Sequence, residues 1–393
     1  MNKNGLFDVG GEKNLIKVKD EANVRIVVCG VGGAGGNTIS RLVEELKDSS
    51  ENVKYVAVNT DIQALSNCKA MHKIQIGKEL LKGKGSGDDP EMGMKAADEN
   101  INDVMAALSK SDMIFFVAGF GKGTGTGALP YIVEKVKSED PDKLVVCVIT
   151  TPFYFEGRRK IKLAKQRIDE LKEFADAVIV ISNQKLAELY GDLNIKEGFK
   201  KSDELLSGAI KGLIKIIKCE GEMNVDFNDV KTVLKNSGSA IMGIGRAKGQ
   251  NRAQEALRNA IENKLISEEI SLEEATKAII FISGKDVKVS EMGMIGNELS
   301  ERLHDDPSII TGFYEVDMDE DLIEVVVYIG GFLSHNPIKK EEKIRAKSKP
   351  IELRMEIDSD GNENKSEVKE DYDEPAFKRR NGGNLDDFFG KIN

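Results

Sequence analysis

The residues best suited to chemistry lie in a glycine-rich stretch that follows an apolar run. The run, residues 113–118, is short, branched and aromatic, which is typical of a buried strand. Glycines let backbone N–H groups crowd around an anion, and a helix expected to open near Pro130 adds further N–H groups. We interpret the stretch as a phosphate-binding loop, with a flexible turn as the alternative. The candidate residues are Gly119, Gly121, Lys122, Gly123, Thr124, Gly125, Thr126 and Gly127.

A second glycine cluster follows the first expected strand, residues 24–29, and precedes a helix expected from about Thr38. Gly30, Gly32 and Gly35 match the dinucleotide-binding fingerprint, which also requires an acid about 20 residues further on. The carboxylate after the second strand is Asp61, 31 positions after Gly30, which is late for a ribose-binding acid. The spacing therefore disfavours a dinucleotide-dependent oxidoreductase, which we keep as the alternative enzyme class.

Acidic residues open two further helices. Asp203 lies near the start of a long apolar helix, where an acid is stabilised by the helix dipole. Asp226 is a good N-cap, and Asp229 follows three residues later, as in a capping box. Capping statistics favour the interpretation that Asp226 and Asp229 only stabilise the start of a helix.

Several of these motifs resemble the tubulin and FtsZ superfamily. The run Gly-Phe-Gly-Lys-Gly-Thr-Gly-Thr-Gly, residues 119–127, resembles its phosphate loop, and it is not a Walker A loop because Lys122 precedes a glycine. Residues 58–65, VNTDIQAL, and the turn-rich residues 83–93 resemble the second and third nucleotide loops of FtsZ. Asn-Val-Asp-Phe-Asn-Asp-Val, residues 224–230, resembles its catalytic loop. The chain is identified as a member of the FtsZ family over about residues 23–332.

The resemblance implies that the chain binds GTP or GDP with Mg²⁺. The position of Asp203 would hydrogen-bond the two N–H donors on one edge of guanine, and Phe199 would stack on the ring. Lys122 and Lys160 depart from the family pattern, and lysine does not reproduce a bidentate arginine contact with phosphate. The remaining implied nucleotide-binding residues are Gly32, Gly33, Ala34, Gly35, Gly36, Asn37, Asp61, Glu156, Arg159, Lys160 and Asn183.

The resemblance also implies catalysis between subunits. The loop carrying Asn224, Asp226 and Asp229 would reach into the nucleotide pocket of the next molecule, where carboxylates can polarise a water for attack on the γ-phosphate. Such a contact is heterologous and generates a head-to-tail filament. The implied function is an assembly-dependent GTPase of the bacterial division ring, and a scaffold that assembles without hydrolysis is a further alternative.

Alternating strands and helices predict an α/β fold. We expect a doubly wound, mainly parallel nucleotide-binding domain, a long central helix, a second α+β domain with a mixed sheet, and a disordered C-terminal tail. The expected boundaries are a flexible N-terminal tail at 1–22, the GTP-binding domain at 23–197, the central helix at 198–219, the second domain with the catalytic loop at 220–333, a linker at 334–370 and a partner-docking peptide at 371–393.

Composition limits the partners and the compartment. The net charge of −10 argues against nucleic-acid binding, and no apolar segment is long enough to insert into a membrane. Four scattered cysteines and three histidines predict neither disulfides nor a protein metal site, as in a cytoplasmic protein. Residues 371–380 resemble the FtsZ peptide that docks on membrane-tethering and regulatory division proteins, which implies a location at mid-cell.

Overall fold

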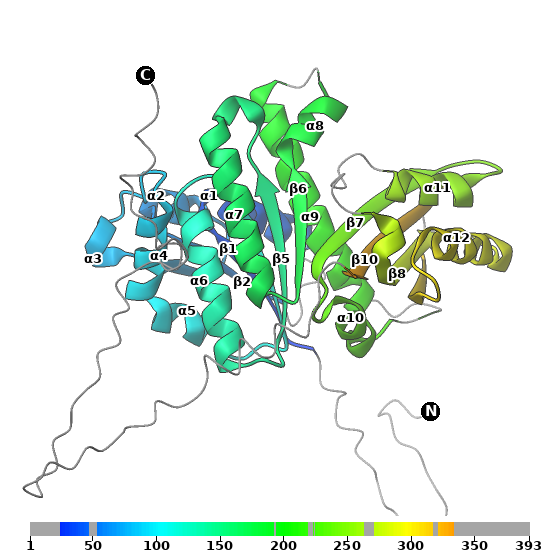
Figure 1. Ribbon diagram of the computed structural model, residues 1–393, viewed down its shortest axis with the longest axis horizontal. Helices are drawn as coiled ribbons and strands as arrows, with labels where there is room; N and C mark the ends of the chain where they lie inside the picture. Colours follow the sequence, from blue (N-terminus) through cyan, green and yellow to red (C-terminus); the bar gives the residue numbers. More distant parts are fainter. Residues whose placement is uncertain are drawn as a thin grey trace, which may run out of the picture. The chain divides into compact units, whose positions relative to one another are not determined.

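A single ten-stranded sheet runs through the structure. The computed structural model describes residues 24–46, 53–191, 194–218, 223, 225–262, 271–316 and 321–333 (Figure 1). The strands follow the order β3-β2-β1-β4-β5-β6-β7-β10-β8-β9 across the sheet. Their bounds are β1 Ile26–Val31, β2 Val53–Asn59, β3 His72–Gln75, β4 Met113–Gly119, β5 Leu144–Thr151, β6 Ala177–Ser182, β7 Gly238–Ala247, β8 Ala275–Gly284, β9 Ser308–Glu315 and β10 Ile323–Phe332.

Helices cover both faces of this sheet (Figure 1). Their bounds are α1 Gly32–Glu45, α2 Ile62–Asn67, α3 Lys78–Leu81, α4 Pro90–Glu99, α5 Ile101–Leu108, α6 Thr124–Glu139, α7 Arg158–Phe174, α8 Asn183–Leu189, α9 Ile195–Lys218, α10 Phe227–Leu234, α11 Arg252–Ile261 and α12 Val289–Arg302. Two 3₁₀ turns lie at Tyr154–Glu156 and Leu272–Glu274.

The first six strands are parallel, and β1, β4 and β5 at the centre of this half of the sheet are buried on both faces. Phe115 of β4 packs in one core cluster with residues of α1 and α9, whereas its neighbour Phe116 packs in the other with residues of α6. Side chains alternate between the two faces of a strand, so a strand covered on both sides reads as a continuous apolar run. The expected doubly wound parallel domain is therefore confirmed.

The remaining strands make the mixed sheet that the sequence predicts. β7 begins parallel to β6, with Ala177–Ile179 opposite Gly238–Ala240, and then runs antiparallel to β10. β8 pairs antiparallel with β10 and parallel with β9. A third core cluster lies between these strands and the helices α11 and α12. All described residues belong to one compact unit, and the domain boundaries expected from the sequence stay a prediction.

The central helix α9 is joined to β10 by a buried hydrogen bond. The hydroxyl of Tyr328 donates to the carbonyl oxygen of Ala209 at 2.8 Å. Gly212, one turn further along α9, makes room for this ring, since a Cβ there would lie 2.4 Å from the Tyr328 hydroxyl. Burial raises the pKa of Tyr328 far above its usual value, so the phenol stays protonated and donates.

Three helix boundaries differ from the sequence-based expectation. α6 begins at Thr124, so Pro130 lies inside it rather than at its start. α1 begins at Gly32 rather than near Thr38. α9 begins at Ile195, so Asp203 lies inside this helix rather than near its start. Glycine-rich sequence argues against helix, but here close packing requires it: a Cβ on Gly127 would lie 1.8 Å from the carbonyl oxygen of Pro90.

Candidate functional site

A pocket of about 590 Å³ lies where the parallel strands end. The carboxyl ends of β1, β2, β4 and β5 border it, which is where parallel α/β sheets bind ligands. Thirteen residues predicted from the sequence line this pocket, so loops far apart in the chain meet at one place. They are Gly32, Gly33, Ala34, Asp61, Gly119, Lys122, Gly123, Thr124, Gly125, Glu156, Asn183, Phe199 and Asp203.

Two helix N-termini meet at the glycine-lined end of the pocket. A Cβ on Gly32, which has φ of +76°, would lie 3.1 Å from the backbone nitrogen of Gly125, so the first turns of α1 and α6 are in close approach. Neither helix has a side-chain N-cap or an acid in its first turn. Uncapped N–H groups and two positive dipole ends therefore face one space, which suits a polyphosphate.

A chain of hydroxyl groups supports this end of the pocket. Thr124 Oγ1 lies 2.8 Å from Thr60 Oγ1 and 3.0 Å from Ser86 Oγ, within hydrogen-bond distance of both. All three side chains are buried. Sequence reasoning recognised the segments that contain Thr60 and Ser86 as nucleotide loops but did not single out these residues. Their small hydroxyl side chains within those segments are the signal that could have identified them.

The helix α9 contributes an aromatic ring and a carboxylate to the lining of the pocket. Phe199 makes an edge contact with Phe153, at 5.2 Å between ring centroids, and is 40% exposed, so part of the ring remains available for stacking. Ser202, which sequence reasoning missed, donates to Asn183 Oδ1 at 2.7 Å and fixes that amide. Burial raises the pKa of Asp203 to about 6, and the nearby positive charge of Arg41 opposes this rise.

The carboxylate of Asp203 is available to a ligand. Among the described residues, no hydrogen bond or ion pair engages its oxygens. An ionised carboxylate accepts hydrogen bonds and can take a pair of N–H donors side by side. An aromatic face next to such an acceptor suits a planar base that carries two adjacent donors.

Eight predicted residues lie outside the lining of this pocket. Arg159 and Lys160 line a neighbouring pocket, and Lys160 pairs with Asp88. Several of the others have structural contacts: Thr126 Oγ1 accepts from Gly121 N at 2.9 Å, and a Cβ on Gly35 would lie 2.5 Å from the carbonyl oxygen of Val117. The residues outside the lining are Gly35, Gly36, Asn37, Gly121, Thr126, Gly127, Arg159 and Lys160.

The predicted catalytic acids lie towards the opposite ends of the parallel strands from the pocket. Asp226 and Asp229 open α10, which precedes β7, and the first residue of β7 donates its N–H to the carbonyl oxygen of Asp176 before β6. The acids therefore lie near the amino ends of the parallel strands, whereas the pocket lies at the carboxyl ends. One eight-residue strand, β5, separates these two ends of the parallel strands by roughly 25 Å. Asn224 lies outside the described residues.

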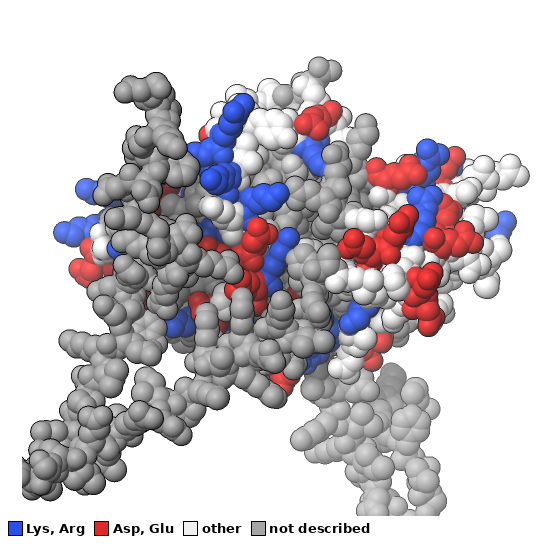
Figure 2. Space-filling view, viewed as in Figure 1, with Lys and Arg blue, Asp and Glu red and all other residues white. Residues whose placement is uncertain are grey.

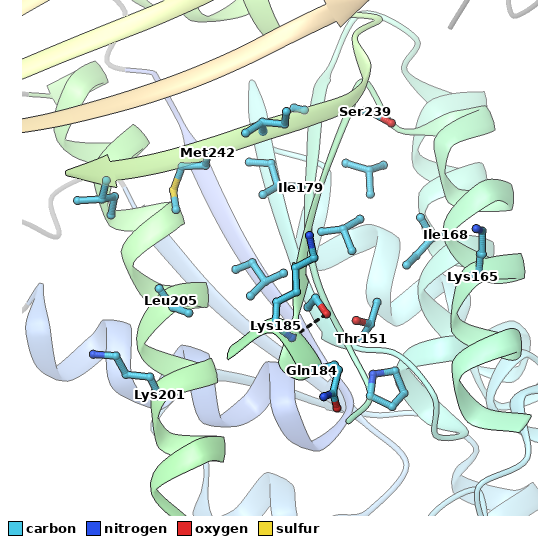
Figure 3. A pocket seen from close by; sticks show the side chains of 18 of the residues that line it. Thr151, Lys165, Ile168, Ile179, Gln184, Lys185, Lys201, Leu205, Ser239 and Met242 are labelled. Atoms are coloured by element: carbon cyan, nitrogen blue, oxygen red, sulfur yellow. Dashed lines mark hydrogen bonds between the residues drawn. The ribbon is translucent and has the colours of Figure 1, made fainter. Parts of the chain in front are cut away.

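A larger cavity, of about 990 Å³, contains none of the predicted site residues. It opens where β6 and β7 separate beyond Ile179 and Ala240. Figure 3 shows Leu205 and Lys201 of α9 on one side, Ile168 and Lys165 of α7 on the other, and Ile179 between them. Its lining combines apolar side chains of β6 and β7 with lysines from α7, α8 and α9, and it includes none of the glycine loops that border the first pocket.

The described parts of the chain lack two other features. No group of three or more histidine, cysteine or carboxylate side chains there can hold a metal ion. No helix among the described residues has the length and apolar character needed to cross a bilayer.

Comparisons with known proteins identify the family and the fold of the chain. Residues 25–191 match the family model described as the Tubulin/FtsZ family, GTPase domain, and residues 238–333 match the FtsZ family, C-terminal domain. The solved structure of an FtsZ dimer from M. jannaschii is similar, with a TM-score of 0.73 and 39% identity, over 80% of this chain and 90% of that chain. A CetZ2 protofilament from Haloferax volcanii, at 21% identity and a TM-score of 0.67, shares the fold.

Curated relatives extend over most of the chain. Cell division protein FtsZ 1 of Pyrococcus furiosus is 40% identical over 331 residues, which cover 84% of this chain and 87% of the relative. Cell division protein FtsZ of Pseudomonas aeruginosa is 39% identical over 318 residues, which cover 80% of this chain and 79% of the relative. The chain therefore belongs to the FtsZ family of tubulin-like GTPases.

Proposed function

We propose that this self-assembling, tubulin-like GTPase of cell division forms the head-to-tail filaments of the division ring and hydrolyses GTP between adjacent subunits. The observation that carries the proposal is the separation of the two halves of the site. The glycine-lined pocket lies at the carboxyl ends of the parallel strands, and Asp226 and Asp229 lie near their amino ends. A single molecule cannot bring these halves together without breaking its sheet.

Each half has a defined part in this proposal. The N-termini of α1 and α6 bind the phosphates through backbone N–H groups. Asp203 accepts the two donors on one edge of guanine, which adenine does not offer, and Phe199 stacks on the base. Asp226 and Asp229 of the next subunit orient a water towards the γ-phosphate. A Mg²⁺ ion would take its ligands mainly from the triphosphate and water, where it neutralises phosphate charge.

Contact between opposite ends of identical molecules has a structural consequence. The pocket end of one subunit meets the acid-bearing end of the next, so the assembly as a whole keeps one unfilled half-site at each of its two ends. Such heterologous contacts do not close on themselves and generate a filament. Hydrolysis then depends on assembly, because the pocket of an isolated subunit lacks the two carboxylates.

The test measures phosphate release and light scattering against protein concentration with GTP, GDP and ATP. The proposal expects a threshold concentration for GTP, turnover per molecule that rises above it, and no assembly-linked turnover with ATP. Turnover per molecule that stays constant on dilution would contradict catalysis between subunits. Assembly without phosphate release would identify a non-hydrolysing scaffold instead.

The proposal includes a docking peptide and a location. Residues 371–380, Asp-Tyr-Asp-Glu-Pro-Ala-Phe-Lys-Arg-Arg, lie outside the described residues and combine acids, a proline, an aromatic residue and a basic end. We propose that this peptide binds membrane-tethering and regulatory division proteins at mid-cell. Deleting residues 371–393 should leave GTP turnover intact and abolish localisation to the division site, and normal localisation of the deletion variant would refute this role.

A further inference from the structure

An ion pair links the edge of the nucleotide pocket to α7. Lys160 Nζ donates to Asp88 Oδ2 at 2.9 Å. Asp88 lines the nucleotide pocket, and both residues line a second pocket beside it. The pair therefore stands at the boundary between the two pockets, and its aspartate comes from the loop of residues 82–88.

This loop is anchored on both sides of Asp88. Ser86 is fixed by Thr124, as described above, and Asp89 caps α4 by accepting from Glu91 N at 2.9 Å. Asp88 itself has φ of +62°, a conformation that residues other than glycine seldom adopt. Its carboxylate pairs with Lys160, so the ion pair forms at a point where the backbone conformation of the loop is unusual.

Lys160 lies next to the phosphate loop as well as to Asp88. A Cβ on Gly121 would lie 3.5 Å from Lys160 Cβ, so the stem of the lysine packs beside the glycine-rich loop. Arg159 and Lys162 flank Lys160 in the sequence, and Figure 2 shows Lys and Arg side chains gathered over α7. The Lys160 side chain is 28% exposed and that of Asp88 is 54% exposed, so neither is locked in place by burial.

We propose that Asp88 is a specificity residue that sets the preference for GTP over GDP by competing with the terminal phosphate for Lys160. The inference rests on the proposed function of this pocket. A terminal phosphate group carries about two negative charges, and in this proposal it lies beside the first turn of α7. When it attracts Lys160, it must displace Asp88, and the diphosphate has no such competitor. Asp88 thereby reduces the triphosphate preference and couples nucleotide state to the loop of residues 82–88.

The experiment is a double-mutant cycle on nucleotide binding by the full chain. The slowly hydrolysed analogue GTPγS and GDP each displace a fluorescent nucleotide at protein concentrations below assembly. Asp88→Asn should raise the ratio of GTPγS to GDP affinity by about three- to fivefold, the range of a solvent-exposed ion pair. Lys160→Gln should lower the ratio, and the double variant should equal Lys160→Gln because Asp88 acts through the lysine.

One control distinguishes the effect of Lys160 from that of any positive charge on α7. A second distinguishes failure of this inference from failure of the proposed function. Lys162→Gln removes a neighbouring charge of the same helix and should leave the ratio unchanged. The inference is overturned if Asp88→Asn leaves the ratio at the wild-type value, or changes it equally with and without Lys160. A wild-type chain that binds neither nucleotide would refute the proposed function itself, whereas binding of both with unaltered ratios would refute only the role of Asp88.

Discussion

Asp226 and Asp229 cap the same helix by exchanging hydrogen bonds. The N–H of Asp229 donates to Asp226 Oδ1 at 2.8 Å, and the N–H of Asp226 donates to Asp229 Oδ2 at 3.1 Å. The structural interpretation of these acids is therefore correct as far as it goes, because both belong to a capping box. Each carboxylate still has one oxygen that this box does not use, so capping and a catalytic role do not exclude each other.

Asp229→Ala is the first test of the catalytic role. The nucleotide pocket lies at the carboxyl ends of the parallel strands, far from Asp229, so the variant should bind GTP normally. It should lose turnover because a carboxylate that orients the attacking water is gone. Because each defective loop faces a neighbour's pocket, the variant should also poison wild-type filaments when the two are mixed. GTP affinity and phosphate release, measured separately and in mixtures, check both expectations. Loss of nucleotide binding would refute the assignment of this loop.

A change at Asp226 separates capping from catalysis. Asparagine caps helices about as well as aspartate, whereas alanine costs about 1 kcal/mol. Asp226→Asn should therefore unfold at the wild-type denaturant midpoint and still lose most turnover, because the negative charge is gone. Asn228→Ala, at the exposed position between the two acids, is the matched control and should keep its activity. Equal activity of Asp226→Asn and wild type would leave Asp226 with a capping role alone.

Lys122→Gly tests a departure from the family pattern inside the phosphate loop. Lys122 lines the nucleotide pocket, is exposed, and has no ion pair among the described residues. Its charge should favour GTP over GDP, so the glycine variant should lose GTP affinity a few-fold, about what an exposed charge contributes. The loss should shrink at high salt. Affinities and GTPase rates unchanged at both low and high salt would instead place Lys122 in solvent.

The sequence predicts the parallel half of the fold because its strands are continuous apolar runs. It places their carboxyl-end loops correctly, and residues as distant as Gly32 and Asp203 do line one pocket. The helix starts at Thr124 and Gly32 could not be predicted, because helix propensity disfavours glycine and the compensating contacts are tertiary. The glycines within β7 similarly interrupt the alternating pattern from which a strand is predicted.

The sequence predicts which loops meet at this pocket but not every contact between them. Thr60 and Ser86 belong to segments expected to bind nucleotide, yet only the fold shows that both hydroxyls meet Thr124. The pairing of Lys160 with Asp88 joins residues 72 positions apart and leaves no local signal in the sequence. Local patterns identify loops and caps, whereas contacts between loops depend on how the sheet is wound.

The raised pKa of Asp203 predicts a pH dependence of guanine binding. Because the folded state holds this proton more tightly than the unfolded chain, the contribution to stability is present below the ordinary pKa of 3.8 and is lost as pH rises through about 6. Guanine donates to the ionised carboxylate, so binding has the opposite dependence. GTP affinity should rise about tenfold per pH unit below 6 and level off above it. Isothermal titration from pH 5 to 8 checks this.

The phosphates of GTP titrate in the same pH range, so the measurement needs a variant without the carboxylate. Asp203→Asn should bind GTP more weakly at pH 8 and should keep only the pH dependence that comes from the phosphates. ATP binding to the wild type supplies the same reference without guanine. An inflection of equal size in the wild type and in Asp203→Asn would show that Asp203 does not contact the base.

Tyr328 and Gly212 provide a test of the packing between α9 and β10. Tyr328→Phe removes the hydroxyl that donates to Ala209 and should lower the free energy of unfolding by about 1 kcal/mol. Gly212→Ala places a Cβ 2.4 Å from that hydroxyl, so overpacking should cost about 1–3 kcal/mol, although alanine favours helix. Chemical unfolding of the full chain measures each value.

The double variant distinguishes a specific clash from general damage. Without the hydroxyl, the nearest atoms to a Cβ at position 212 lie 3.6 Å away, which is ordinary van der Waals contact. Gly212→Ala should therefore cost little in the Tyr328→Phe background, and its higher helix propensity can make it stabilising there. Additive losses in the double variant would mean that the two residues do not meet as the structure places them. Because α9 carries Asp203 and Phe199 to the nucleotide and β10 belongs to the mixed half of the sheet, rescue of stability should be accompanied by rescue of GTP affinity.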